Sequence, residues 1–546
     1  MDASCVFCIG VHIGCFNPLP LGRDRTVHVI YTSMNTPTQQ FLSGNEAIAR
    51  GAWESGLKVA CAYPGTPSTE ILETMAGYPE IDAQWSVNEK VAYEVALGAA
   101  YGGVRSFFAC KHVGLNVAMD PLMTSSYTGV NGGFVAVVAD DPGLHSSQNE
   151  QDSRWVAVFS KLPMIEPSNP RECYRFVKEA YSISETFDTP VLLRTTTRVS
   201  HSKENLETGQ RGDIPARPFE VNIPKYVMVP KNAYARHLVV EERLNRLAQY
   251  AETTDLNRVE EGAGSPAFVA SGAAYHYVKE RFPASPVLKL GMVWPLCVNK
   301  IRAFSELHGG IFVIEEIDPF LETMLRSHGI PVRAKHPSWR VSELKPEYID
   351  AIAAGEEKQD APRPARPPQL CKGCPHRLVF NALKELGVVV AGDIGCYTLG
   401  TLPPFSALHT CLCMGAGVTV HEGFRRARFA GSDKVVGVAG DSTFVHSGIT
   451  GLINAAYNGI NGLIMVLDNS TTAMTGGQNH PATGKTIRNQ PARKLVIEDI
   501  CRACGVDNVD VVRPQQFREL KELIGRRLSE EALSVIVVRS PCILIK

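Results

Sequence analysis

The chain has 546 residues, 44% of them hydrophobic, and this length predicts roughly three to four domains with ample cores. Its formal net charge of −1 at pH 7 excludes the strongly basic surface typical of proteins that bind nucleic acids or anionic membranes. No apolar run approaches the roughly 20 residues of a membrane span, and no basic-then-apolar signal peptide opens the chain, so we expect a cytoplasmic protein.

Residues 1–33 differ in character from the sequence that follows them, and we expect the natural chain to start at Met34. We interpret them as an N-terminal extension, whose cysteines could bind a metal but which more simply has no structure. The first structured element follows soon after, because FLSGNEAIARGAWESG (41–56) predicts a capped helix.

Residues 34–225 alternate short apolar runs with helical patterns, which predicts a first α/β domain. Its strands are expected within VACAYPG (59–65), RSFFACKH (105–112) and GGFVAVVADD (132–141). Between the first two, WSVNEKVAYEVALGAAYGG (85–103) predicts a short strand and then a helix that begins near Glu89.

The helix after Glu89 is expected to bury Val91, Val95 and Ala99 on one face, with Gly98 permitting close approach. A carboxylate in the first turn of a helix is favoured by the helix dipole even on a surface. Spacing alone therefore leaves open whether Glu89 is a surface residue or a functional one.

Residues 235–355 carry a second, smaller α/β pattern, with strand-like runs in PAFVAS (266–271), PVLKLGMVW (286–294) and GIFVIEEI (310–317). Residues 356–368 end in the Pro-rich DAPRPARPP and predict an extended, semi-rigid linker. Residues 369–546 predict a further α/β domain.

The last domain contains a strand, helix and strand in GDSTFVHSGITGLINAAYNGINGLIMVLDNSTTAMTGGQ (440–478) and the run before it. Asp441 follows the buried run 434–440, and Asn469 follows the buried run 462–468, 28 positions later. The carboxyl ends of neighbouring parallel strands meet at one edge of a sheet, where ligands bind. Oxygen ligands of this kind suit Mg²⁺ that bridges a protein to phosphate, although a pair of ordinary turns is the simpler alternative.

This arrangement resembles the diphosphate-binding motif of thiamine diphosphate (ThDP) enzymes, with Ser442 where many members have Gly. The resemblance implies that Asp441 and Asn469 bind Mg²⁺ through their side chains and Thr471 through its backbone carbonyl. It also identifies Glu89 with the glutamate that activates the aminopyrimidine ring of the cofactor.

Six further motifs resemble the large subunit of indolepyruvate:ferredoxin oxidoreductases, in the family of ThDP-dependent 2-oxoacid:ferredoxin oxidoreductases. They are AYPGTPSTEI (62–71), KHVGLNVAMDPLM (111–123), ADDPGLHSSQNEQDSR (139–154), LCKGCPHR (370–377), GDIGCYTLG (392–400) and LDNSTTAMTGGQ (467–478). The likeness extends over nearly all of residues 41–542. It implies parallel-sheet domains of three types: pyrimidine-binding (34–225), transketolase C-terminal-like (235–355) and diphosphate-binding (369–546).

The resemblance implies oxidative decarboxylation of an aryl 2-oxoacid, with electrons passed to ferredoxin or another acceptor and the acyl group to coenzyme A. It also implies a smaller partner subunit in a hetero-oligomer built on a homodimer. Thr66 corresponds to a substrate-contacting threonine, although capping of the next helix explains it equally well. The remaining candidates near substrate or cofactor are His112, Asn116, His376, Cys396 and His446, and for His112 a structural role is the alternative.

The resemblance further implies that Cys371, Cys374, Cys396 and Cys542 bind one [4Fe–4S] cluster close to ThDP. Zinc is the competing metal for the C-x₂-C pair, and free thiols are a further alternative. A second C-x₂-C pair, Cys501 and Cys504, is expected in a helix with a structural role.

The sequence ends in SPCILIK without the C-x₂-C-x₂-C-x₃-C-P pattern of a ferredoxin module, which such relatives usually carry next. We therefore expect electrons to leave by another route. A non-oxidative ThDP decarboxylase or carboligase is the alternative function, and a non-catalytic scaffold is disfavoured because it needs neither Glu89 nor Asp441.

Overall fold

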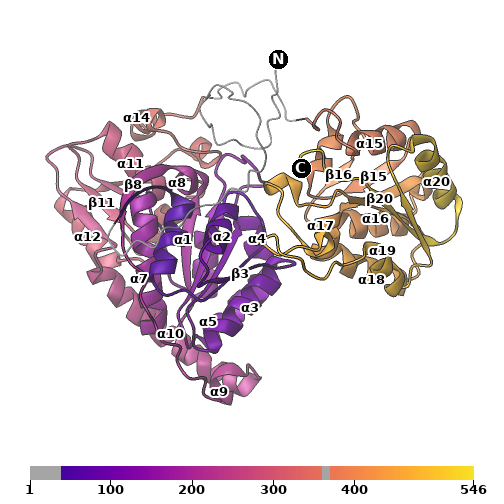
Figure 1. Cartoon of the computed structure of the whole chain (residues 1–546). Coiled ribbons are helices and arrows are strands. Elements are labelled where there is room, and N and C mark those ends of the chain that lie inside the picture. Colours follow the sequence, from indigo (N-terminus) through magenta and orange to yellow (C-terminus); the bar gives the residue numbers. More distant parts are fainter. Residues whose placement is uncertain (1–37, 360–368, 546) are drawn as a thin grey trace, which may run out of the picture. The chain divides into compact units, whose positions relative to one another are not determined.

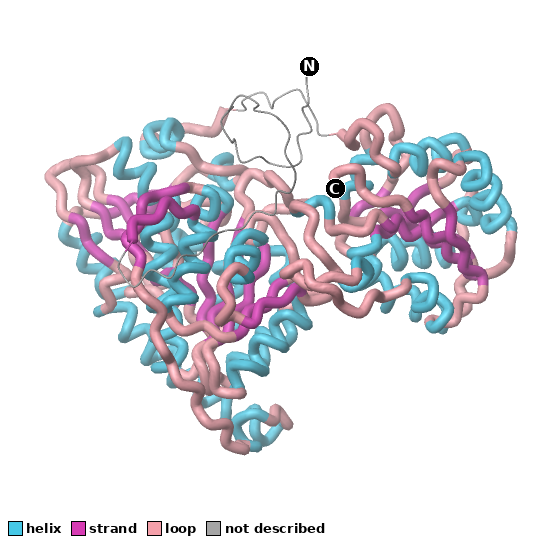
Figure 2. The backbone as a smooth tube through the Cα atoms, in the orientation of Figure 1, coloured by secondary structure: helices cyan, strands magenta, loops and turns pink. Residues whose placement is uncertain are grey.

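The computed structural model describes residues 38–359 and 369–545, which form two compact units that divide between residues 361 and 362. We call them the N-terminal unit (38–359) and the C-terminal unit (369–545). In each unit, helices cover the faces of largely parallel sheets (Figure 1), and the strands lie inside the helical layers (Figure 2). The predicted α/β class is confirmed. The predicted extension 1–33 and linker residues 360–368 lie outside the described residues.

A seven-stranded sheet forms the centre of the N-terminal unit, and its strands are parallel except for the antiparallel edge strand β12. Their order across the sheet is β12 (Met292–Trp294), β6 (Met164–Ile165), β7 (Val191–Thr196), β5 (Phe134–Asp140), β4 (Ser106–Lys111), β2 (Val59–Ala62) and β3 (Asp82–Trp85). β5 and β7 are buried along their whole length, which explains why they read as continuous apolar runs.

A five-stranded sheet and a two-stranded ribbon complete this unit. The sheet has the order β14 (Val332–Ala334), β13 (Ile311–Ile314), β10 (Phe268–Ser271), β11 (Val287–Leu290) and β9 (Arg258–Glu260), and the ribbon pairs β1 (Thr38–Ser43) with β8 (Lys203–Thr208). Because β12 belongs to the second predicted segment but joins the first sheet, the two segments share one compact unit. Their division into two domains stays a prediction.

Buried ion pairs also connect these two segments. Arg154 Nη1 donates to Glu315 Oε2 at 2.8 Å, and both side chains are almost completely buried. The helices of the unit are α1 (Gly44–Glu54), α2 (Thr69–Ala76), α3 (Glu89–Tyr101), α4 (His112–Val117), α5 (Met119–Thr128), α6 (Arg154–Ser160), α7 (Pro170–Phe187), α8 (Thr197–His201), α9 (Ile223–Tyr226), α10 (Pro230–Thr253), α11 (Gly272–Arg281), α12 (Val298–Leu307), α13 (Phe320–Ser327) and α14 (Ile349–Ala353).

Side-chain caps determine where α1 and α3 begin. Ser43 and Glu46 form a reciprocal capping box at α1, as the sequence predicts, but the residues just before Ser43 are strand β1. Asn88 caps α3 by accepting from Val91 N at 2.9 Å, which places Glu89 at the first helical position.

The predicted buried face of α3 is wrong. Val95 is 40% exposed, and Gly98 has no neighbouring atom within 4 Å of the position of a Cβ. The buried face is instead formed by Ala92, Tyr93, Ala96, Leu97 and Ala100. Its alanines allow the helix axis to lie close to the sheet, so the small residues rather than the valines face inward.

A six-stranded parallel sheet forms the C-terminal unit, in the order β16 (Thr410–Cys411), β15 (Val389–Gly392), β17 (Val435–Gly440), β18 (Gly462–Asp468), β20 (Leu533–Arg539) and β19 (Asn508–Val512). Its helices are α15 (His376–Glu385), α16 (Ala416–Ala427), α17 (Asp441–Thr443), α18 (Ile449–Tyr457), α19 (Ile497–Ala503) and α20 (Phe517–Ser529). The predicted strand–helix–strand unit is present, with a π-helical turn, Phe444–Gly448, leading into α18.

Two apolar clusters hold this sheet, one on each face. One includes Phe380 of α15 and Ile524 of α20, and the other includes Leu452 of α18 and Cys501 of α19. Cys501 is buried inside α19 and Cys504 is its C-terminal cap residue, so only the first lies within the predicted helix. Their structural role stays a prediction. Across residues 38–359 and 369–545, no helix is both long and apolar enough to cross a membrane.

Candidate functional site

The carboxylate of Asp441 is buried at the carboxyl end of β17, where the strand turns into α17. Its Oδ1 accepts from Ser442 N at 2.9 Å, and its Oδ2 accepts from Ser470 N at 2.8 Å. The register pairs Gly440 with Leu467, so the turns after β17 and β18 lie side by side. The structure therefore brings together the two polar clusters that the sequence placed 28 positions apart.

The turn after β18 places backbone and side-chain polar atoms at the sheet edge where Asp441 lies. Ser470 has a left-handed φ of 60°, which residues other than glycine rarely adopt, and its N–H donates to both Asp441 and Asp468. Asn469 is 8% exposed, and its Oδ1 accepts from Thr471 N at 3.2 Å. This strained turn holds Asn469 and Thr471 beside the Asp441 carboxylate.

Two buried carboxylates, those of Asp441 and Asp468, lie close together at this edge. Burial raises the pKa of Asp441, and the Asp468 charge raises it further, while His480 and the Ser442 amide oppose the rise. His480 Nε2 lies 3.3 Å from Asp441 Oδ2 and forms an ion pair with it when the imidazole is protonated. Asp468 has its own cation, because Arg539 Nε donates to its Oδ2 at 2.7 Å. The Asp441 contact is thus to a titratable imidazole, and a divalent cation would supply a fixed positive charge there.

Side-chain hydrogen bonds connect the hydroxyl and amide residues that follow Asp441 and Asn469 in sequence. Thr472 Oγ1 donates to Ser442 Oγ at 3.0 Å, and Thr475 Oγ1 donates to Gln478 Oε1 at 2.5 Å. Ser442, Thr471 and Gln478 are all largely buried. The TTAMTGGQ stretch therefore folds back on the end of β18 and provides hydroxyl, amide and carbonyl groups there.

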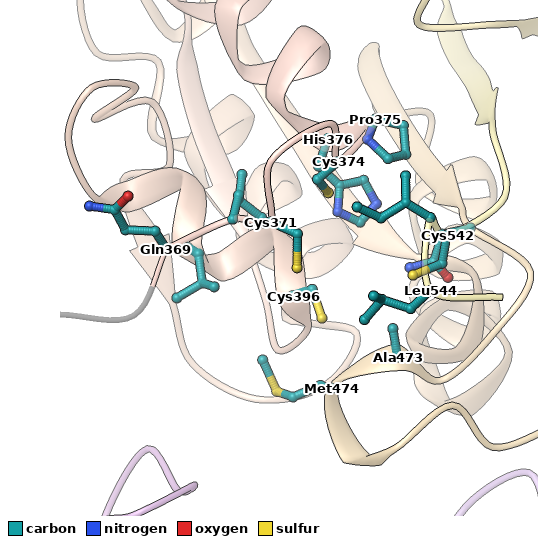
Figure 3. Close-up of a pocket in the computed structure, with 14 residues that line it drawn as sticks. Gln369, Cys371, Cys374, Pro375, His376, Cys396, Ala473, Met474, Cys542 and Leu544 are labelled. Atoms are coloured by element: carbon teal, nitrogen blue, oxygen red, sulfur yellow. The ribbon is translucent and has the colours of Figure 1, made fainter. Parts of the chain in front are cut away.

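A pocket of about 60 Å³ lies next to this edge and is lined by all four of the cysteines predicted to bind one cluster (Figure 3). Cys371 and Cys374 open the described part of the unit, Cys396 follows β15, and Cys542 follows β20. The backbone connects the pocket to the Asp441 edge, because Cys542 N donates to the carbonyl of Asn469 at 2.9 Å. The other lining residues include Asn469, His376, Met474 and Leu544.

The pocket combines four partly exposed thiols with a buried, neutral imidazole, that of His376. Burial raises the pKa of Cys374, and the nearby Cys542 raises it further. Burial lowers the pKa of His376 to about 4, and neither of its ring nitrogens has a hydrogen-bond partner among the described residues. Within residues 38–359 and 369–545, no three His, Cys, Asp or Glu side chains are positioned to hold a single metal ion.

Asp393, directly after β15 in the motif GDIGCYTLG, is a buried polar residue that was not among the predicted site residues. Its carboxylate is fully buried and accepts from Tyr397 Oη and from Gly415 N at 2.9 Å. Burial raises its pKa to about 7, although Tyr397 and the backbone amides oppose the rise. The sequence does contain a signal for Asp393, because the residue directly follows a strand-like apolar run, as Asp441 does.

In the N-terminal unit, Glu89 is 5% exposed and packs against α4. A Cβ added at Gly114 would lie 2.4 Å from Glu89 Oε1, so only glycine leaves room for the carboxylate there. The surface alternative for Glu89 is therefore wrong, and the residue is a buried carboxylate at the start of a helix.

The other predicted residues of this unit surround the same end of the sheet. His112 is 1% exposed, and its Nε2 lies 3.1 Å from the carbonyl of Asn149, while Nδ1 has no partner among the described residues. Asn116 donates to Gln151 Oε1 at 3.0 Å. Thr66 does not cap α2, whose N-cap is Ser68, but its carbonyl accepts from Ser146 Oγ at 3.0 Å. The capping alternative for Thr66 is thus wrong.

The predicted residues fall into one group in each unit. Thr66, Glu89 and His112 belong to the N-terminal unit, whereas Asp441, Ser442, Asn469, Thr471, His376 and the four cysteines belong to the C-terminal unit. His446, in the turn after α17, has its Nδ1 2.6 Å from Ser447 Oγ. In both units, the groups gather at the carboxyl ends of parallel strands.

Two protein families match the chain, one in each unit. "Pyruvate flavodoxin/ferredoxin oxidoreductase, thiamine diP-bdg" matches residues 50–262, and "Thiamine pyrophosphate enzyme, C-terminal TPP binding domain" matches residues 393–538. Thiamine pyrophosphate is another name for ThDP. The first match contains Glu89, and the second contains Asp441 and Asn469.

Full-length relatives share about two fifths of their residues with this chain. The indolepyruvate oxidoreductase subunit IorA of Archaeoglobus fulgidus is 40% identical over 92% of this chain and 86% of its own, and that of Methanothermobacter marburgensis is 42% identical over 92% and 87%. A solved 2-oxoglutarate:ferredoxin oxidoreductase from Magnetococcus marinus covers 58% of this chain and 65% of its own, with 16% identity and a TM-score of 0.48.

The raised pKa of Asp393 predicts a specific dependence of stability on pH. The folded state favours the protonated carboxyl, so the stabilisation is complete below about pH 4 and is lost as pH rises through about 7. We expect the free energy of unfolding of the wild type, relative to that of Asp393→Asn, to fall by up to about 4 kcal/mol over this pH window. Thermal unfolding of both proteins measures the difference. Asp433→Asn, at an exposed carboxylate, is the control. Parallel profiles for wild type and Asp393→Asn would contradict the assignment.

Proposed function

We propose a function for this chain, which belongs to the family of indolepyruvate oxidoreductase IorA subunits. It is the ThDP-dependent subunit, and it oxidatively decarboxylates an aryl 2-oxoacid. The observation that carries the proposal is the buried Asp441 carboxylate beside Asn469, at the strand ends of the unit that matches ThDP-binding domains. The acyl group would pass to coenzyme A and the electrons to ferredoxin or a similar acceptor. A smaller partner subunit is part of the proposal, because the relatives are named as subunits.

The C-terminal unit would hold Mg²⁺ and the diphosphate. The donor set fits this role, since Asp441 and Asn469 offer hard oxygen ligands and the Thr471 carbonyl belongs to the same turn. The burial of the Asp441 carboxylate and the left-handed turn at Ser470 support the assignment. Ser442 would face the diphosphate through its hydroxyl, which Thr472 Oγ1 orients.

The N-terminal unit would act on the aminopyrimidine end of the cofactor. ThDP supplies an electron sink that accepts the negative charge left on carbon when the carboxyl group departs. The Glu89 carboxylate would hold a proton shared with the aminopyrimidine ring, and its burial against Gly114 keeps water away from that hydrogen bond. Thr66 and His112 lie at the same strand ends and would orient the substrate.

We assign the cysteine-lined pocket to one [4Fe–4S] cluster, bound by Cys371, Cys374, Cys396 and Cys542. A cluster of this kind takes up and releases single electrons. All four cysteines line the same pocket, which supports a shared site for them. Zinc is the competing metal, because the same thiolates would also bind it. The buried His376 would pack near the cluster as a neutral side chain.

The role of Glu89 predicts a separation of binding from turnover. Glu89→Gln should bind ThDP and Mg²⁺ as the wild type does but lose about 100- to 10,000-fold in turnover, because an amide cannot take part in proton exchange with the ring. Titration calorimetry and assays of acceptor reduction measure the two effects. Asp441→Asn should instead lose affinity for Mg²⁺ and ThDP.

The matched control for Glu89 is Glu94→Gln, which changes an exposed carboxylate of the same helix. We expect no change in that variant. Full turnover in Glu89→Gln would refute the proposed proton exchange.

The cluster assignment predicts about four irons and four acid-labile sulfides per chain after anaerobic purification. Cys374→Ala should lose this iron and the visible absorbance that accompanies it, because the variant removes one ligand. Cys504→Ala removes a cysteine of the other C-x₂-C pair and should keep both. Zinc, or no metal, in active wild-type protein would exclude the cluster.

The proposed substrate class predicts that indolepyruvate, phenylpyruvate and 4-hydroxyphenylpyruvate are used in preference to pyruvate. Differences of a methylene or a hydroxyl in a pocket change discrimination by about 1 to 3 kcal/mol, so their ranking among themselves does not follow from the sequence. Steady-state values of kcat/KM with coenzyme A, ferredoxin and the partner subunit measure the preference. A higher kcat/KM for pyruvate than for every arylpyruvate would overturn the assignment.

A further inference from the structure

Lys111, the last residue of β4, places an amino group at the same strand ends as Glu89. Its neighbours along the strand, Ala109 and Cys110, are fully buried, and Lys111 itself is only partly accessible. Burial lowers the pKa of Lys111 to about 8, although the charges of Asp141 and Glu89 raise it. A lysine that lies inside a protein normally has a carboxylate partner.

Within the described part of the chain, Lys111 has no such partner. Its Nζ donates to the carbonyl of Ser146 at 2.8 Å, and among residues 38–359 and 369–545 the charges of Asp141 and Glu89 act on it without a hydrogen bond. An ammonium group has three donors, so this single contact leaves two of them available. The site therefore has capacity for an anion.

Asp141 is the nearest candidate for a partner, but its oxygens are already used. Oδ2 accepts from Ser146 N at 2.8 Å and from Ser147 Oγ at 2.7 Å, and Oδ1 accepts from Thr197 Oγ1 at 2.7 Å. These hydrogen bonds keep the pKa of Asp141 low despite its burial. Asp141 thus shapes the 141–146 loop and contributes a charge nearby without forming an ion pair with Lys111.

The lysine stem is held in place from two sides. A Cβ added at Gly65 would lie 3.1 Å from Lys111 Cγ, so the turn before Thr66 packs directly on the stem. Ser146, whose carbonyl accepts from the lysine, also donates through Oγ to the Thr66 carbonyl. The ammonium group is therefore positioned between the Thr66 turn and the 141–146 loop.

A second polar group beside Lys111 also lacks a partner. The next residue, His112, is 1% exposed, and its Nδ1 makes no hydrogen bond within the described residues. Glu89 lies close enough for its charge to act on Lys111. Two groups with unused hydrogen-bonding capacity thus adjoin the carboxylate that we assign to cofactor activation.

We propose that the Lys111 ammonium binds the carboxylate of the 2-oxoacid substrate and so orients it at the Glu89 site. The inference rests on the proposed function and adds to it the residue that recognises an acid. An aryl 2-oxoacid has a single negative charge, in its carboxylate, and a charge-assisted hydrogen bond to a confined ammonium would select it over neutral carbonyl compounds. Because this contact forms in the ground state, it should affect KM more than kcat.

Lys111→Gln tests the proposal, because glutamine can still donate to the Ser146 carbonyl but has no charge. The probe is indole-3-propionate, an unreactive carboxylate, with its neutral amide as the comparison, each titrated calorimetrically into the full chain with its partner subunit. We expect carboxylate affinity to fall about ten- to hundredfold, since a hydrogen bond to a charged group contributes about 1.5 to 3 kcal/mol. Amide affinity and the thermal midpoint should not change.

Kinetics and two further variants complete the test. KM for indolepyruvate should rise by a similar factor in Lys111→Gln, with kcat within a few-fold of the wild type. Lys111→Arg keeps the charge and should restore most of the affinity for the carboxylate. Lys203→Gln removes an exposed lysine of β8 and should behave as the wild type.

Unchanged carboxylate affinity in Lys111→Gln would overturn the inference. Equal loss of carboxylate and amide binding, or a lowered thermal midpoint, would also overturn it, because Lys111 would then only tether the 141–146 loop. Failure of the proposed function would appear elsewhere, as a wild-type enzyme that oxidises no arylpyruvate.

Discussion

The structure of the C-terminal unit's polar edge depends on the burial of one carboxylate, that of Asp441. Removing a charged carboxylate from water costs several kcal/mol unless nearby dipoles or cations replace the lost hydration. The Ser442 and Ser470 amides provide part of this replacement, and the second of them requires a left-handed turn after β18. The parallel register of β17 and β18 places the two turns side by side, and the left-handed turn at Ser470 then aims an amide at the buried charge.

The N-terminal unit solves a related problem with the opposite sign. Lys111 places an ammonium group at the end of β4. Its Nζ donates to the Ser146 carbonyl, and the turn at Gly65 packs against its side-chain methylenes. Each site would be completed by a ligand of opposite charge. A divalent cation would bind the Asp441 carboxylate, and an acid would bind the Lys111 ammonium.

The cysteines illustrate how distant segments form one environment. Cys371 and Cys542 are at opposite ends of the described C-terminal unit in sequence, yet both line the pocket beside Asn469. The hydrogen bond from Cys542 N to the Asn469 carbonyl fixes the last segment against the turn after β18. Ser540 N also donates to the Asp468 carbonyl at 2.9 Å, and Asn469 itself lines the pocket, so the cysteine pocket adjoins the edge that we assign to Mg²⁺ and diphosphate.

The sequence by itself determined the α/β class, the buried strands and the pairing of Asp441 with Asn469, because apolar runs and turn residues are local signals with a fixed period. It also identified the four cysteines by resemblance. Only the tertiary structure decided which face of α3 is buried, that Glu89 packs on Gly114, and that Asp393 and Lys111 are confined charges. Those properties depend on which distant atoms remove water from a side chain, and periodicity along the chain does not encode that information.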